Sequence, residues 1–102
     1  MVYDSTKALL RTIIWSLQSI EKVGWEDQVE SGRECLYEIH QMAHPEHKLY
    51  KTDASGDGAP PGAIYLRAAR AVPHVKSMVK AIRRKDQALA IESGRAALVA
   101  MG

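Results

Sequence analysis

The chain of 102 residues carries a formal net charge of +2, and 46% of its residues are hydrophobic and 25% charged. These values fit one domain with a modest core, and the single cysteine, Cys35, excludes an internal disulfide. No apolar run is long enough to span a membrane, and Asp4, Lys7 and Arg11 interrupt any signal-peptide core. We therefore expect one soluble, cytoplasmic domain over residues 1–102.

Charge is distributed unevenly along the sequence. Residues 1–61 contain 6 Lys or Arg and 10 Asp or Glu, a balance of −4, whereas residues 62–102 contain 8 and 2, a balance of +6. This difference predicts either attraction between the two halves or an acidic partner for the basic half.

One four-residue sequence occurs twice: Glu-Ser-Gly-Arg at 30–33 and again at 92–95, 62 positions later. Apolar positions on both sides of it correspond at the same interval without a gap, which indicates an internal repeat. The corresponding apolar pairs are Ile13 and Val75, Leu17 and Val79, Ile20 and Ile82, Val29 and Ile91, and Leu36 and Leu98.

Two amphipathic helices are predicted in the first repeat. Asp4 or Ser5 suits an N-cap, apolar residues then recur at helical spacing, and Gly24 suits a helix stop, which predicts a helix over 5–23. A second apolar stripe ends before Pro45 and predicts a helix over 26–43. This stripe consists of Trp25, Val29, Gly32, Leu36, Ile39 and Ala43, extended by Cys35 and Met42.

A long loop over 44–62, rich in Pro, Gly, Asp and Ser, separates the two repeats. In the second repeat we expect a third helix that Pro73 kinks and a fourth helix that Asp86 caps. The fourth helix is apolar nearly all round, which predicts that it is well buried. The predicted fold is all-α: a four-helix bundle built from two repeated helix hairpins, 5–43 and 63–101.

The repeated Ser-Gly pairs favour close helix packing. A mid-helix glycine costs about 1 kcal/mol against alanine, so its occurrence at the same place in both repeats indicates a packing role. A functional interpretation also stands, in which Arg33 and Arg95 line a site for an anion. The predicted helix-crossing residues, within the monomer or across a dimer axis, are Ser31, Gly32, Ser93 and Gly94.

Charged rows on the second and third helices are the candidate partner-binding surfaces. The third helix carries a basic face suited to an acidic protein, RNA or DNA, and this face could also pair with the acidic row, inside the protein or between subunits. The acidic row consists of Glu30, Glu34 and Glu38. The basic face consists of Arg67, Arg70, Lys76, Lys80, Arg83 and Arg84.

Three histidines, His40, His44 and His47, cluster after the acidic row. His40 and His44 are spaced i, i+4 as in helical metal sites, although an HExxH motif is missing and a proline follows His44. A metal site and a polar helix end both remain open. The sequence has no Gly-rich phosphate loop and no spacing typical of a catalytic triad, so we expect neither catalysis nor a cofactor.

These features favour a small protein–protein interaction or regulatory module that acts by occupying a larger partner. We also expect the chain to form a homodimer. The alternatives are a nucleic-acid-binding protein that uses the basic face and a metal-binding protein that uses the three histidines.

Overall fold

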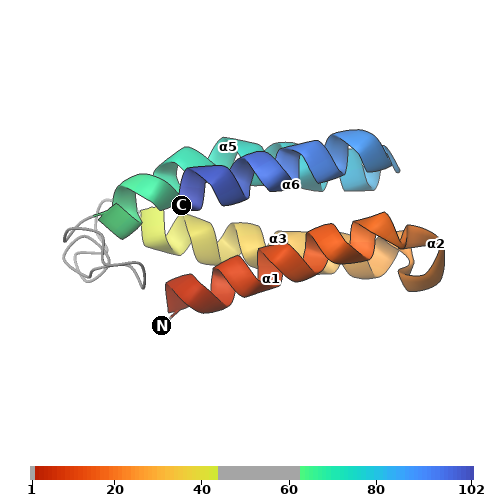
Figure 1. Cartoon of the computed structure of the whole chain (residues 1–102), viewed down its shortest axis with the longest axis horizontal. Coiled ribbons are helices and arrows are strands. Elements are labelled where there is room, and N and C mark those ends of the chain that lie inside the picture. The colour runs from red at the N-terminus through yellow and green to blue at the C-terminus, as the bar shows by residue number, and fades with distance from the viewer. Residues whose placement is uncertain (1, 44–62) are drawn as a thin grey trace.

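The computed structural model describes residues 2–43 and 63–102, and within this part of the chain all regular structure is helical. Four long helices and one short helix follow in the order α1, α2, α3, α5 and α6 (Figure 1). Their bounds are Val2–Gln18 for α1, Ile20–Val23 for α2, Trp25–Ala43 for α3, Ala63–Arg83 for α5 and Gln87–Met101 for α6. The all-α prediction is confirmed, and the predicted loop over 44–62 lies outside the described residues.

The first predicted helix, 5–23, begins earlier than expected and is divided near its end. Helix α1 includes Asp4 in its first turn, where a carboxylate favours the helix dipole, so Asp4 is not an N-cap. The N–H of Ser19 bonds to the carbonyl of Ser16 at 3.0 Å, a tighter turn that separates α1 from α2. Gly24, with φ of 78°, then ends α2 as predicted.

Helix α5 is one continuous element although Pro73 lies inside it. Pro73 is on the exposed side, where water can bond to the backbone carbonyl that its missing N–H leaves without a helix partner. The kink at Pro73 stays a prediction.

The turn from α5 to α6 combines two capping devices. Lys85 adopts a left-handed φ of 59°, and the N–H of Asp86 bonds back to the carbonyl of Ala81 at 2.9 Å, which closes the C-terminus of α5. The carboxylate of Asp86 then accepts a bond from the N–H of Leu89 at 3.1 Å, so the predicted cap of the last helix is confirmed.

The four long helices lie alongside one another, with α1 and α6 nearest the viewer in Figure 1 and α3 and α5 behind them. Helix α5 packs extensively on α6 and α3, and α1 packs on both of these as well. Hydrogen bonds join the ends of α1 to the opposite ends of α6, among them one at 2.7 Å from the Lys7 ammonium to the carbonyl of Gly102. The Tyr3 hydroxyl donates to the carbonyl of Met101, and the Gln87 side chain donates to the carbonyl of Leu17 at 2.7 Å.

The core draws apolar side chains from all four long helices. At several pairs of positions 62 residues apart, both residues are buried in this core. This is expected if the two halves of the chain turn the same positions inward. The pairs in which both members are buried include Ile13 and Val75, Leu17 and Val79, Ile20 and Ile82, and Gly32 and Gly94.

The buried face of α3 is rotated from the predicted stripe. Trp25, Val29 and Leu36 are half-buried because they lie on a flank of the helix, whereas the polar Gln28 is buried. The buried positions of α3 are Gln28, Gly32, Cys35, Ile39 and Met42.

Helix α6 is less covered than its composition predicted. Val99 is 82% exposed and Leu89 is 39% exposed, so the prediction that this helix is well buried is wrong along one side. The reason is that α6 packs on α1 and α5, which leaves its remaining side open.

The two repeated glycines lie where α3 and α6 come close to neighbouring helices within the monomer. A Cβ added to Gly32 would lie 3.1 Å from Cγ2 of Val79 on α5. A Cβ added to Gly94 would lie 2.9 Å from Cγ1 of Ile14 on α1 and 3.1 Å from Sδ of Met78 on α5. These distances are shorter than ordinary van der Waals contacts, so a side chain at either position would require the neighbouring side chains to shift.

We expect Gly94→Leu to lower the free energy of unfolding by at least about 2 kcal/mol, because the new side chain overpacks the contact with α1. Glu92→Leu changes an exposed position of the same helix and should alter stability by less than about 0.5 kcal/mol. Urea unfolding followed by circular dichroism measures both values. A Gly94→Leu protein as stable as the parent would contradict the close packing of α6.

Candidate functional site

A groove with a volume of about 420 Å³ lies between α3 and α5. It belongs to the pair of helices that Figure 1 draws behind α1 and α6. Helix α3 lines the groove with Arg33, Leu36, Tyr37 and His40. Helix α5 lines it with Lys76, Val79, Lys80 and Arg83.

Helical spacing and one glycine place these side chains together. Lys76, Lys80 and Arg83 are spaced i, i+4, i+7, so they share one face of α5. On α3 the groove residues likewise recur every three or four positions. Because Gly32 has no Cβ, Val79 of α5 packs directly against the backbone of α3, and the two rows border a single groove.

The groove has an apolar floor and a positive rim. Leu36 is half-buried and Val79 is only 5% exposed, so both form the floor, while Tyr37 is 65% exposed at the edge. The four rim cations are exposed, and within the described residues none of them forms an ion pair. A cationic rim above an apolar floor suits a ligand that carries both carboxylates or phosphates and an apolar part. The rim cations are Arg33, Lys76, Lys80 and Arg83.

The predicted basic face of the third helix is divided by the structure. Three of its six members, Lys76, Lys80 and Arg83, line the groove, and the other three lie outside it. Arg70 and Arg84 are exposed on α5 outside the groove. Arg67 lies beside the end of α6, since a Cβ added to Gly102 would lie 2.9 Å from Nη1 of Arg67.

The predicted acidic row of α3 is also divided. Glu30 and Glu34 are exposed, and within the described residues neither forms an ion pair or hydrogen bond. Glu38 is half-buried and accepts a hydrogen bond from the Thr6 hydroxyl of α1 at 2.9 Å. Glu38 therefore joins α3 to α1, whereas Glu30 and Glu34 remain available to a partner.

The remaining predicted site residues are two serines and three histidines. Ser31 is half-buried and Ser93 is buried, beside the glycine contacts and outside the groove. His40 is exposed at the groove, whereas His44 and His47 lie outside the described residues. Over residues 2–43 and 63–102, no group of three His, Cys, Asp or Glu side chains could hold a metal ion. The three-histidine site stays a prediction.

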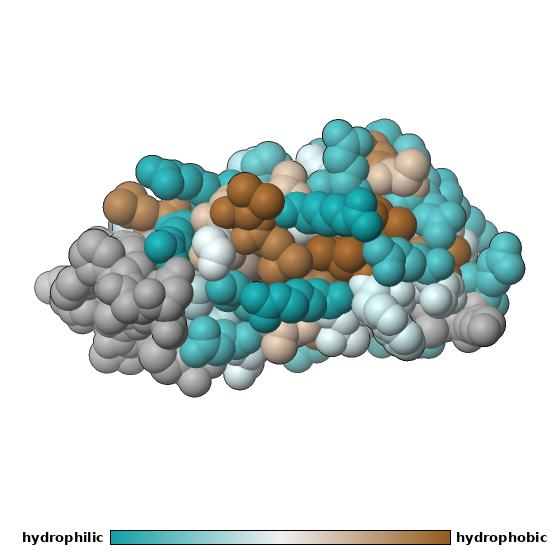
Figure 2. All heavy atoms as spheres, in the orientation of Figure 1, coloured by the Kyte–Doolittle hydropathy of each residue, from teal (hydrophilic) through white to brown (hydrophobic). Residues whose placement is uncertain are grey.

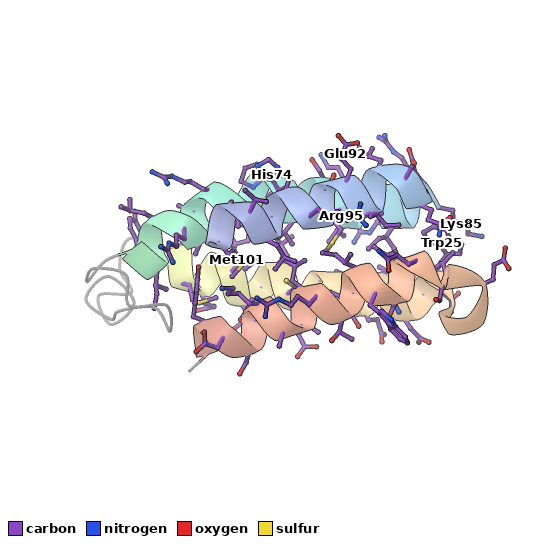
Figure 3. All side chains as sticks on the ribbon, viewed as in Figure 1. Trp25, His74, Lys85, Glu92, Arg95 and Met101 are labelled. Carbon is purple, nitrogen blue, oxygen red and sulfur yellow. The ribbon has the colours of Figure 1, made fainter. Side chains whose placement is uncertain are left out.

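The other half of the chain carries different chemistry at the corresponding positions. Figure 2 shows the face of α1 and α6, where an apolar strip runs between polar rims. Figure 3 places Arg95 on the side of α6 toward α1 and Glu92 on the side away from it. The two halves thus share buried positions but not the cationic row of α5. The residues 62 positions before the three α5 cations are Ile14, Gln18 and Glu21.

Cys35, the lone cysteine, is fully buried on α3. Burial raises the pKa of its thiol to about 12, and the nearby Glu38 and Glu34 carboxylates act in the same direction. Since the thiolate is the nucleophilic and metal-binding form, this side chain behaves as a small apolar residue.

Comparison with family models, with curated protein sequences and with solved structures finds no match to this chain. Among the described helices, none combines the length and the apolar character needed to cross a bilayer.

Cys35 predicts a loss of stability at high pH. The thiol has an ordinary pKa of 9.0 when unfolded and a folded pKa of about 12, so above pH 9.0 unfolding releases a proton and becomes more favourable. The free energy of unfolding should fall by up to about 1.4 kcal/mol per pH unit from this group. Urea unfolding of Cys35→Ala should show a shallower fall than the parent; equal slopes would contradict the raised pKa.

Proposed function

We propose that the protein is a non-catalytic protein–protein interaction module that binds an acidic surface of its partner in the α3–α5 groove. The observation that carries the proposal is the set of four rim cations, which no carboxylate of the described residues neutralises, above an apolar floor. In this role the protein acts in the cytoplasm as a regulatory module that occupies a larger partner, without a cofactor.

The dimensions of the groove favour a helical partner segment. The row from Lys76 to Arg83 extends over seven residue-to-residue steps of the helix, which is about 10 Å. A partner helix with carboxylates at i, i+4 and i+7 presents negative charge over the same length, and an apolar residue between them can meet Leu36 and Val79. Exposed cations also attract such a segment from a distance, which raises its rate of association.

The architecture that goes with this proposal is a four-helix bundle of two repeated hairpins, 5–43 and 63–101. It is supported by the burial of both members of several pairs 62 residues apart, such as Ile13 and Val75, and by the packing of α1 and α5 on both α3 and α6. In this arrangement the interior of both halves is alike and the difference in function lies on the surface.

A glutamate-rich amphipathic helical peptide with a fluorescent label is the probe for the proposal. We expect Lys76→Ala with Lys80→Ala to weaken its binding at least about 10-fold, because two rim charges are lost. Arg70→Ala with Arg84→Ala removes the same charge from exposed positions of α5 outside the groove and should have a much smaller effect. Equal weakening by both pairs would mean that the peptide responds to net charge alone, and the groove proposal would fail.

Nucleic-acid binding is the second candidate, and one observation favours it. Tyr37 is 65% exposed at the edge of the groove, where its ring could stack on a base beside the cations. Base stacking on an aromatic side chain contributes about 1–3 kcal/mol.

If the groove binds single-stranded RNA, Tyr37→Ala should weaken binding by at least about 5-fold and Tyr37→Phe should not, since the stacking ring is retained. Fluorescence anisotropy with a mixed-sequence oligonucleotide at low salt measures this difference. An unchanged affinity for Tyr37→Ala would exclude the stacking contact, and no binding at low salt would exclude this candidate.

A further inference from the structure

The exposed surface of α3 carries opposite charges on neighbouring sides. Glu30 and Glu34 are exposed, and Arg33 between them lines the groove. At 3.6 residues per turn, Arg33 is offset around the helix by about 60° from Glu30 and about 100° from Glu34. The acidic crest, defined here as Glu30 and Glu34, therefore runs directly alongside the positive groove.

Both surfaces lack a counter-charge in the part of the chain that the structure describes. Neither the acidic crest nor the four rim cations take part in an ion pair there. A partner that supplied counter-charges to both surfaces at once would need a positive surface for the acidic crest and, beside it, a negative surface for the groove. A second copy of this chain has that arrangement, and a two-fold axis makes each surface meet the other one twice.

We infer that a second copy of this chain occupies the α3–α5 groove, with the two α3 helices antiparallel across a two-fold axis near Arg33 and Glu34. This inference rests on one part of the proposed function, the binding of an acidic surface in the groove, and assigns that surface to a second copy in place of a larger partner. With the axis between these residues, each Arg33 faces Glu34 of the partner subunit. Glu30 of the partner subunit then lies at the level of Tyr37, near the Lys76 side of the groove.

The contact also covers apolar surface. Tyr37 is 65% exposed and Leu36 is half-buried, and both lie on α3 near the axis. Their burial between two copies supplies an apolar centre inside a ring of charges, the usual arrangement of a protein interface.

The equivalent surface of α6 does not offer the same complementarity. It repeats Glu92 and Arg95, but the neighbouring helix carries Ile14 and Gln18 where α5 carries lysines. Exposed acidic residues outside α3 can therefore serve as matched controls for the acidic crest.

The test is a charge exchange followed by sedimentation velocity of the full chain at low salt. Glu30→Lys with Glu34→Lys makes crest and groove both positive, and Arg33→Glu, Lys76→Glu and Lys80→Glu together change the net charge of the four-residue rim from +4 to −2, so that crest and groove are both negative. Each variant alone should be monomeric, with self-association weakened at least about 10-fold by like-charge contact. An equimolar mixture should restore a heterodimer, since both crest–groove contacts then join opposite charges.

Two further measurements complete the test. Glu21→Lys with Glu92→Lys changes the same charge at exposed positions outside α3 and should leave the dimer intact. The parent dimer should dissociate between about 0.1 M and 1 M salt, as the screening length falls from about 10 Å to 3 Å. Circular dichroism checks that each variant remains folded.

A parent protein that stays monomeric, a dimeric Glu30→Lys, Glu34→Lys variant, or a mixture that does not associate would each overturn the inference. The same variant separates this result from the proposed function, because its groove keeps every cation. If it binds the glutamate-rich peptide while the parent is monomeric, the groove is a binding site for another protein and the second copy is not its partner.

Discussion

The close approach of α3 to α5 at Gly32 is the constraint on which the rest of the molecule depends. With no side chain at this position, Val79 rests against the backbone of α3, and the cationic row of α5 borders one groove together with Arg33 of α3. Gly94 has the corresponding role for α6, against α1 and α5. A larger residue at either position would displace the side chains of α1 or α5 that pack against it, so the packing of these helices depends on two glycines in the interior.

Sequence periodicity and capping residues were sufficient to predict the long helices, including the stop at Gly24 and the cap at Asp86. The division of the first helix at Ser19 was missed, since no breaking residue stands there and the local pattern stays helical. The groove was also missed as a unit. Helical spacing places Lys76, Lys80 and Arg83 on one face of α5. It does not predict that Arg33 of α3 lies across the groove from them.

The two halves illustrate how differently interior and surface positions are constrained. Several buried positions 62 residues apart carry apolar residues of similar size, such as Ile13 and Val75 or Ile20 and Ile82, since a change of volume in a packed core is costly. Exposed charges contribute little to stability and can be exchanged freely. Gln18 and Lys80, which are both exposed and 62 positions apart, differ in this way, while the paired glycines are the same. Ile14 is buried whereas its counterpart Lys76 is exposed, so at that position the two halves differ in burial as well.

The molecule has a cationic groove between α3 and α5 and an apolar strip on the face of α1 and α6. The binding strength of these two surfaces depends on the salt in the surrounding solution. Dissolved ions weaken attraction between exposed charges, whereas strongly hydrated salts such as sulfate strengthen apolar association. The two faces therefore respond to the same change of medium in opposite directions. The type and concentration of salt, without any ligand, can therefore determine whether the groove or the apolar strip associates more strongly with other molecules.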